Sequence, residues 1–347
     1  FHTGLFAESD WQGARWIGYE DLPAAKRMVP GVHGNGDKLG QLCVDRPVIP
    51  LFRKEIEISK KIKEATLYIT GLGQYEASIN GQKIGDAFLS PGWTNYDKTV
   101  FYNQYDVTTM LKQGRNALGA IVGNGFYNIN RERYRKLVIA WGNPKLIGQL
   151  RIRFTDGSEQ MVVTGSDWKT APSPITFTSI YGGEDYDARL EQAGWNQPGF
   201  SDQAWKQAVL VTPPTGLLTE ESDYSLRFKE SFSAKNIKKL ADGSYLYDFG
   251  QNASGSVGLK VKGTKGQTIK LTPSELITRE GQPNQSATGS PDYFVYILKG
   301  DGLETWQPRF TYTGFRYVKV EGAVPEKEKP APGAAVNPET RSVWSVR

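Results

Sequence analysis

Apolar and polar residues alternate with a period of two along much of the chain. Residues 65–69, 150–154 and 257–261 each carry an apolar side chain at every second position. In residues 150–154, two arginines occupy the positions between the apolar ones. Successive side chains of an extended strand point to opposite faces, so this pattern is typical of a half-buried strand. It predicts short strands that each place one face on a core.

Turn signals separate these predicted strands. Dipeptides that favour hairpin turns occur at Asn80-Gly81, Asp156-Gly157, Asp242-Gly243 and Asp301-Gly302. Helical signals are few: residues 106–112 fit a short helix or turn capped by Asp106, and residues 201–207 fit one helical turn. The sequence therefore predicts an all-β fold, in which antiparallel sheets pack face to face as two jelly-roll-like β-sandwiches with connecting loops.

Shifts in composition divide the chain into five parts. Residues 211–216 are proline-rich, and residues 325–338 are rich in Pro, Ala, Glu and Lys, which is typical of linkers. The predicted parts are an N-terminal segment with a long loop (1–49), a first β-sandwich (50–212), a linker (213–229), a second β-sandwich (230–322) and a further linker (323–347). Because residues 341–347 regain a strand-like pattern, we expect another element to follow them. The missing N-terminal Met suggests a processed or trimmed product.

Composition and charge exclude several classes of protein. The 347 residues carry a net charge of +5, but Lys and Arg are spread along the chain without a basic block, so we expect no nucleic-acid partner. No apolar run is long enough to predict a membrane span. Cys43 is the single cysteine, which excludes an intrachain disulfide and a thiolate metal cluster.

The two histidines argue against two common kinds of catalysis. His2 lies at the terminus and His33 lies in a glycine-rich loop, and neither has the spacing of zinc ligands. The chain also lacks the Gly-x-Ser-x-Gly turn that exposes a nucleophilic serine. We therefore expect neither zinc chemistry nor a Ser–His–Asp triad.

Carboxylates are concentrated in the stretch Tyr181–Arg189, which reads YGGEDYDAR. Asp185 and Asp187 would share one face of a strand about 6–7 Å apart, which overlaps the roughly 6.5–9.5 Å between the acids of inverting glycosidases. Three interpretations stay open. The pair is catalytic, or it forms structural ion pairs such as Asp187 with Arg189, or it contacts a sugar or Ca²⁺.

Aromatic side chains are the other candidates for binding. Aromatic faces stack on sugar rings, and nearby Asn or Asp side chains can satisfy the hydroxyls. The alternative is that these rings only fill the sandwich core. The candidates are Trp93, Tyr96, Tyr102, Phe126 and Tyr127, whereas Trp168, Trp195 and Trp205 are interpreted as packing residues.

Four segments together resemble the N-terminal half of bacterial α-L-rhamnosidases. The match rests on their common order over about 300 residues, since each segment alone is a weak signal. The segments are Ser9–Gly18; residues 81–127 with Leu89–Asp97, Tyr105–Thr108 and Gly123–Tyr127; Tyr181–Arg189 followed by Gly194-Trp195; and Tyr247–Gly255 continuing to Trp306–Val318.

The resemblance implies two β-sandwich modules that precede an (α/α)₆ catalytic barrel. The first module, which in some members binds rhamnose with calcium, would cover about 50–210, and the second about 230–322. The acidic motif of the barrel is absent from this sequence, so no catalytic residue is assigned. The resemblance thus implies a non-catalytic accessory region of an α-L-rhamnosidase-like glycoside hydrolase.

The implied partners are a rhamnose-containing oligo- or polysaccharide and the C-terminal (α/α)₆ domain of the same protein, and this substrate class favours a periplasmic or secreted location. Calcium stays a candidate ligand. Two alternatives stay open: a purely structural scaffold, and the same region of a polysaccharide lyase or another glycosidase. The predicted carbohydrate-binding residues are Asn124, Tyr127, Glu184, Asp185, Asp187 and Arg189.

Overall fold

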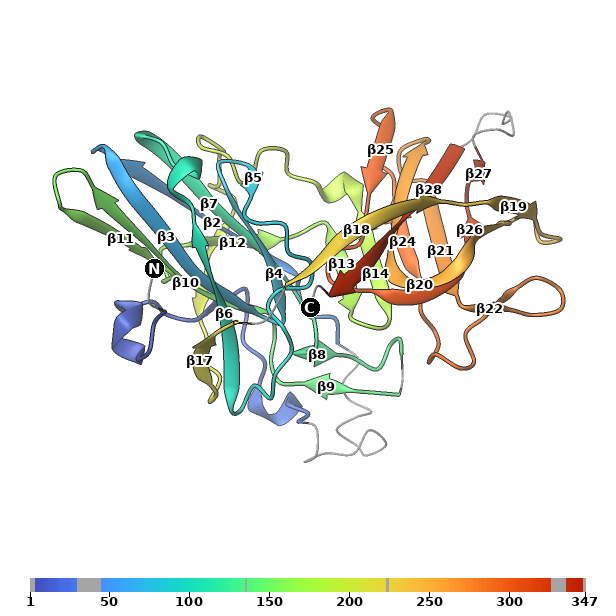
Figure 1. The fold of residues 1–347 in the computed structure, drawn as a ribbon, viewed down its shortest axis with the longest axis horizontal. Helices are drawn as coiled ribbons and strands as arrows, with labels where there is room; N and C mark the ends of the chain where they lie inside the picture. The colour runs from blue at the N-terminus through green and yellow to red at the C-terminus, as the bar shows by residue number, and fades with distance from the viewer. Residues whose placement is uncertain (1–3, 30–44, 135, 223–224, 326–334, 346–347) are drawn as a thin grey trace.

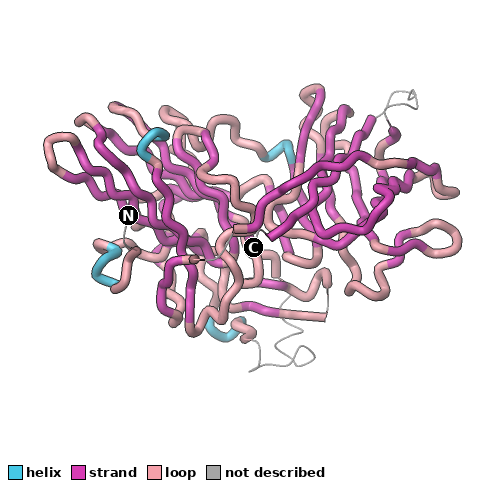
Figure 2. Tube along the Cα trace, in the orientation of Figure 1, coloured by secondary structure: helices cyan, strands magenta, loops and turns pink. Residues whose placement is uncertain are grey.

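The structure is a computed structural model that describes residues 4–29, 45–134, 136–222, 225–325 and 335–345, the last range for its backbone alone. Figure 1 shows two β-rich lobes side by side, the first built from the N-terminal half and the second from the C-terminal half. Strands and loops account for nearly all of the described chain, and the few helical turns are short (Figure 2). These turns are 3₁₀ segments: η1 Glu8–Trp11, η2 Ala24–Lys26, η3 Thr108–Met110 and η4 Ala188–Leu190.

Two sheets packed face to face form the first lobe. The first runs in the order β16 (Val209–Leu210), β1 (Ile17–Gly18), β10 (Lys145–Phe154), β3 (Ile62–Leu72), β6 (Thr99–Asp106) and β17 (Leu217–Glu220), with β11 (Glu159–Val163) also on β10. The second runs in the order β15 (Lys206–Gln207), β12 (Lys169–Pro172), β2 (Pro50–Ile58), β7 (Gly114–Gly123), β4 (Gln74–Ile79) and β5 (Gln82–Lys83). A small pair, β8 (Asn128–Ile129) with β9 (Ile139–Ala140), lies below them (Figure 1).

A larger sheet forms the second lobe. Its order is β13 (Ile175–Ser179), β14 (Gly183–Asp187), β24 (Phe294–Ile297), β21 (Thr268–Ser274), β26 (Thr313–Glu321), β20 (Tyr245–Lys262), β28 (Ala335–Ser345) and β18 (Leu226–Ser233). Side pairings add β19 (Asn236–Lys239) and β25 (Leu303–Trp306) on β20 and β27 (Val324–Pro325) on β28, and β22 (Leu276–Ile277) pairs with β23 (Pro283–Asn284). The all-β prediction is thus confirmed, with sheets that are mainly antiparallel.

The predicted strands are present, but one of them is buried on both faces. In β10 the expected alternation holds, because Leu150 and Ile152 are buried while Arg153 is exposed. In β3, Tyr68 is buried as well as its apolar neighbours. Its ring packs in a cluster with Trp11 and Trp16, so the N-terminal segment covers the face that the sequence predicted to be solvated.

The predicted turns are confirmed at three of the four dipeptides, and Asp301-Gly302 lies in a bend between β24 and β25, which do not pair with each other. Asn80 and Gly81 both have positive φ, 53° and 84°, as the tight β4–β5 hairpin requires. The glycines at 157, 243 and 302 also have positive φ. Asp106 accepts hydrogen bonds from the backbone N–H and the hydroxyl of Thr108 at the start of η3. The helical turn predicted for 201–207 is only a turn, because residues 206–207 pair with β12 as β15.

Pairing, rather than composition, decides which lobe a strand joins. The prediction placed residues 175–187 in the first sandwich, but β14 pairs with β24 in parallel, with Asp185 opposite Val295. The hairpin β13–β14 therefore extends the sheet of the second lobe. The segments predicted as linkers also contain strands, since β17 pairs with β6 and β28 pairs with β20. Of the long loop predicted near the N-terminus, residues 30–44 lie outside the described chain.

Candidate functional site at the junction of the two lobes

The acidic stretch Tyr181–Arg189 forms strand β14 and the turns at its two ends. Neighbouring residues on a strand face opposite ways, so Glu184 and Asp185 have different surroundings. Glu184 is fully buried, and its Oε2 accepts the backbone N–H groups of Arg309 (3.1 Å) and Phe310 (3.3 Å). Burial raises the pKa of Glu184 to about 8. Its Oε1 has no partner among the described residues, so Glu184 is a buried acid rather than a solvent-facing one.

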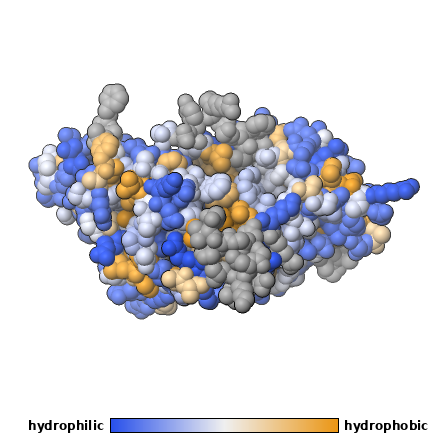
Figure 3. Space-filling view, turned by 90° about the horizontal axis from the view of Figure 1, so that it is seen from below, coloured by the Kyte–Doolittle hydropathy of each residue, from blue (hydrophilic) through white to orange (hydrophobic). Residues whose placement is uncertain are grey.

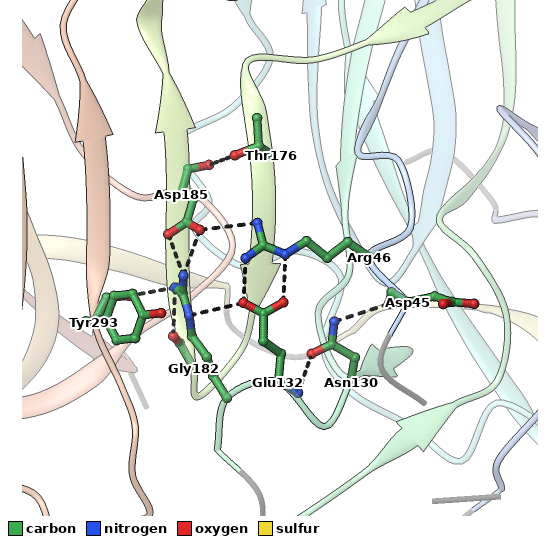
Figure 4. Close-up of polar contacts among 9 residues, drawn as sticks. Asp45, Arg46, Asn130, Glu132, Thr176, Gly182, Asp185 and Tyr293 are labelled. Atoms are coloured by element: carbon green, nitrogen blue, oxygen red, sulfur yellow. Dashed lines mark hydrogen bonds and ion pairs between the residues drawn. The ribbon is translucent and has the colours of Figure 1, made fainter. Parts of the chain in front are cut away.

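Asp185 is held by two arginines (Figure 4). Arg133, whose side chain is 2% exposed, donates from Nη2 to both carboxylate oxygens, at 2.8 and 2.7 Å. The same guanidinium donates from Nη1 to the carbonyl of Tyr293 at 3.0 Å. It lies between the rings of Phe177 and Tyr293, at 4.2 and 3.6 Å from their centroids. Burial raises the pKa of Asp185, although Arg133 acts in the opposite direction.

Arg46 continues the network toward solvent. It donates to both oxygens of Glu132, at 2.6 and 2.5 Å, and approaches Asp185 at 3.4 Å. We call Arg46, Glu132, Arg133 and Asp185 the arginine joint. Glu132 and Arg133 follow β8 in the first lobe, whereas Asp185 belongs to the sheet of the second, so the joint ties the two lobes together. Both oxygens of each carboxylate accept hydrogen bonds from an arginine of the joint.

Asp187 pairs with Arg189, which confirms the ion-pair interpretation of that part of the sequence. Arg189 donates from Nε and Nη2 to the carboxylate at 2.8 and 2.7 Å, and its backbone N–H donates to the same group at 3.1 Å. These hydrogen bonds lower the pKa of Asp187. The carboxylate thereby caps the short η4 turn.

Asn124 and Tyr127 lie in the interior. The amide of Asn124 donates to the carbonyl of Thr178 at 2.7 Å, which links the end of β7 to β13. Tyr127 packs edge-on against Tyr96, and burial raises its pKa. The structure therefore does not gather the six predicted residues into one exposed site, since Tyr127 packs against Tyr96 in the first lobe while Asp187 and Arg189 pair in the second.

The aromatic candidates separate into buried rings and one exposed ring. Tyr96, Tyr102 and Tyr127 are buried, whereas Trp93 is 60% exposed. The indole of Trp93 stacks on Phe126, with centroids 4.7 Å apart and planes inclined by 14°. Since Phe126 covers one face of the indole, we infer that the exposed surface is mainly the other face.

Phe126 continues a row of rings that crosses the junction. It meets Tyr181 edge-on at 5.5 Å, and Tyr181 in turn contacts Tyr134 at 4.7 Å and Tyr312 at 6.0 Å. We call Trp93, Phe126, Tyr181, Tyr134 and Tyr312 the aromatic row. Sequence reasoning missed Tyr134, Tyr181 and Tyr312 as aromatic candidates, because none of the three carries a periodic signal. Trp168 and Trp205 are buried, as predicted for packing residues.

The surface outside the arginine joint and the aromatic row gives weaker signs of ligand binding. On the face seen in Figure 3, hydrophobic residues gather in small patches separated by hydrophilic ones, as is usual for a protein surface. Within the described residues, no cluster of three His, Cys, Asp or Glu side chains could hold a metal ion. In Tyr181–Arg189, donors of this chain engage Asp185, Asp187 and one oxygen of Glu184. Among the helical segments described here, none has the length and apolarity to cross a membrane.

The chain thus folds into two β-rich lobes that share the sheet of the second lobe through the hairpin β13–β14, and comparisons with known proteins identify the family. Residues 60–230 match the α-L-rhamnosidase N-terminal domain, and residues 238–338 match the bacterial α-L-rhamnosidase concanavalin-like domain. The chain belongs to the bacterial α-L-rhamnosidase family, of which it represents these two domains.

Relatives agree with this assignment. The chain is 35% identical over 332 residues to an α-L-rhamnosidase of Formosa agariphila and 39% identical over 335 residues to one of Streptomyces avermitilis. These matches cover 93% and 92% of this chain, but only 35% and 32% of the relatives. The chain thus spans about a third of their length.

Solved structures share the same fold. The α-L-rhamnosidase of Dictyoglumus thermophilum is 38% identical, with a TM-score of 0.82 over 99% of this chain and 37% of that one. The Streptomyces avermitilis enzyme, solved in complex with L-rhamnose, is 35% identical, with a TM-score of 0.79 over 86% of this chain and 29% of that one.

Proposed function

We propose that this chain is a non-catalytic accessory region of an α-L-rhamnosidase and that it binds rhamnose-containing carbohydrate at Trp93, the outer end of the aromatic row. The observation that carries the proposal is the exposed indole, held flat by its stack on Phe126. A ring that is already fixed by packing loses little conformational freedom when a sugar stacks on it.

The chemistry of the ligand suits this surface. A pyranose presents an apolar face of C–H groups, and a 6-deoxy sugar such as rhamnose adds a methyl group, so both can pack on an aromatic face. Support for the sugar class comes from family membership and from the Streptomyces avermitilis relative solved with L-rhamnose. Asn95, an exposed residue two positions after Trp93 in the chain, is the polar residue that we propose for the sugar hydroxyls.

The competing proposal is a pure scaffold, in which the two lobes only support the rest of the enzyme. The inner rings of the aromatic row and the arginine joint fit that role, because they are packed or paired within the chain. The exposure of Trp93 favours binding instead. In either case, we propose that the rest of the protein contributes the (α/α)₆ domain that hydrolyses the glycoside, and that the enzyme acts in the periplasm or outside the cell.

Calorimetric titration of the chain with L-rhamnose and with a rhamnose-containing polysaccharide, each with and without Ca²⁺, tests the binding. We expect Trp93→Ala to weaken binding at least tenfold. Phe6→Ala is the matched control, because Phe6 is an 85% exposed aromatic outside the row, and we expect it to leave binding unchanged. No detectable binding by the wild type would favour the scaffold, whereas equal affinities for the wild type and Trp93→Ala would overturn the assignment of binding to Trp93.

Hydrolysis is tested separately with an aryl α-L-rhamnoside. Because the carboxylates of Tyr181–Arg189 are engaged by protein donors, we expect the chain alone to release no aryl group. Release that disappears in Asp185→Asn or Asp187→Asn would overturn the non-catalytic assignment.

A further inference from the structure

A second concave surface lies on the open side of the first sandwich, away from the aromatic row. A groove of about 510 Å³ runs between β2 of one sheet and β11 of the other. Its volume is in the range of small-molecule sites. The turn of residues 164–167, where the chain crosses from β11 toward β12, contributes to its lining. The lining also includes Arg15, which precedes β1 in the chain, and Leu210 of β16, which pairs with β1.

Polar residues occupy core-facing positions along this groove. Lys54 has the same parity on β2 as Phe52 and Ile56, which belong to the hydrophobic core. Gln160 has the same parity on β11 as Val162, which belongs to that core too. A charged or amide side chain at a core-facing position is costly unless it meets solvent or a polar partner. The groove is therefore lined by polar residues together with Ile56 and Val162 of the core.

The contacts that span the groove can open at low cost. Lys54 pairs with Asp167 at 2.5 Å, and the Asp167 side chain is 65% exposed. Gln160 donates from Nε2 to the carbonyl of Glu57 at 3.1 Å. A solvent-exposed ion pair is worth only about 0–1 kcal/mol, so a ligand that offers equivalent hydrogen bonds can replace both contacts.

We propose that this groove is a second carbohydrate-binding site, which takes a neutral oligosaccharide. Hydroxyl groups would exchange with the Lys54–Asp167 and Gln160–Glu57 contacts, and the apolar sugar face would lie on Ile56 and Val162. The lining has both cationic and anionic groups, which disfavours a strongly charged ligand of either sign. No aromatic residue is present among its described lining residues, so binding relies on hydrogen bonds. This inference takes its ligand class from the proposed function, but it uses a different surface.

The test is a titration of the full chain with methyl α-L-rhamnopyranoside and with a linear α-rhamno-trisaccharide. Stoichiometry is followed by calorimetry, and the side-chain amide of Gln160 is followed by NMR. We expect two sites for the trisaccharide and a saturable shift of the Gln160 amide. Lys54→Ala/Gln160→Ala should remove one site and leave the other. Trp93→Ala should remove the other site while the Gln160 shift persists.

Lys60→Ala is the matched control, because Lys60 forms a comparable exposed pair with Asp156 at 2.9 Å outside the groove. We expect it to change neither stoichiometry nor shift. A single site that is lost in Trp93→Ala and unaffected by Lys54→Ala/Gln160→Ala would overturn the groove and leave the Trp93 site standing. A single site that is lost in Lys54→Ala/Gln160→Ala and unaffected by Trp93→Ala would overturn the Trp93 site and support the groove.

Discussion

The arginine joint and the aromatic row are adjacent at the junction of the lobes, yet they differ in how their chemistry is satisfied. They are neighbours even in sequence, since Arg133 precedes Tyr134 and Tyr181 lies four residues before Asp185. In the joint, each charge finds its partner within the chain. In the row, the inner rings contact one another while Trp93 stays open to solvent. Charges that are paired within the chain indicate a structural role, whereas a rigid ring that is exposed to solvent indicates a role in binding.

Breaking the joint should have the largest effect on stability. Arg133→Met leaves Asp185 and the carbonyl of Tyr293 buried without their donor, so we expect a loss of about 3–5 kcal/mol in the free energy of unfolding. Urea denaturation measures it. Arg133→Lys keeps the charge but loses the bidentate geometry. Its free energy of unfolding should therefore lie between those of the wild type and Arg133→Met. A loss under about 1 kcal/mol in Arg133→Met would show that the joint is dispensable.

Glu184 should make the protein less stable as pH rises. Its pKa is about 8 in the fold against 4.5 for an ordinary glutamate, so the folded state binds the proton more tightly. The contribution of Glu184 to the free energy of unfolding should be greatest below pH 4.5, fall by at most about 5 kcal/mol between pH 4.5 and 8, and stay level above. Glu184→Gln should reduce the decline measured by denaturation at pH 5, 7 and 9. Buried Asp292, whose pKa burial raises to about 7, should account for a remaining part.

Asp187 provides the contrast for that experiment. Its pKa is lowered by Arg189, so its contribution is present at neutral pH and is lost as pH falls through the acidic range below 3.8. Asp187→Asn should therefore leave the slope between pH 5 and 9 unchanged. If Glu184→Gln and Asp187→Asn gave the same profile, burial of Glu184 would not be the cause of the decline.

Removing the open end of the row should affect stability less than binding. Trp93→Ala deletes a stacked pair at the surface, which is worth about 0.5–1.5 kcal/mol beyond its buried area. We expect a small drop in the denaturation midpoint together with the tenfold loss of sugar affinity. A large destabilisation with no change in affinity would instead assign Trp93 to the scaffold.

The outer part of the joint should matter least. Arg46 is 41% exposed and its pair with Glu132 meets solvent, so Arg46→Ala should cost about 0–1 kcal/mol. Added salt should reduce the difference between this variant and the wild type. A cost equal to that of Arg133→Met would mean that the whole network, rather than its buried arginine, holds the lobes together.

Local structure could be predicted well from the sequence. The alternation in residues 150–154 and 257–261 corresponds to β10 and β20, and the dipeptide at Asn80-Gly81 turns a hairpin. These features depend on a few consecutive residues, which the chain presents in order. The pairing of Asp187 with Arg189 could be anticipated for the same reason.

Long-range partners could not be predicted in this way. The same alternation is compatible with any neighbouring strand, so nothing in residues 175–187 indicated that β14 would join β24. Burial was ambiguous for a similar reason: Trp93 and Tyr96 lie three residues apart in one motif, yet only Trp93 is exposed.

The sequence by itself determined the class of this protein: short strands, tight turns, and motifs in the order found in α-L-rhamnosidases. The tertiary structure decided which charges are paired and which rings face solvent. The physical reason is that the partners of Asp185 and of Phe126 come from distant parts of the chain. Whether a carboxylate or an indole is available to a ligand depends on what folds against it.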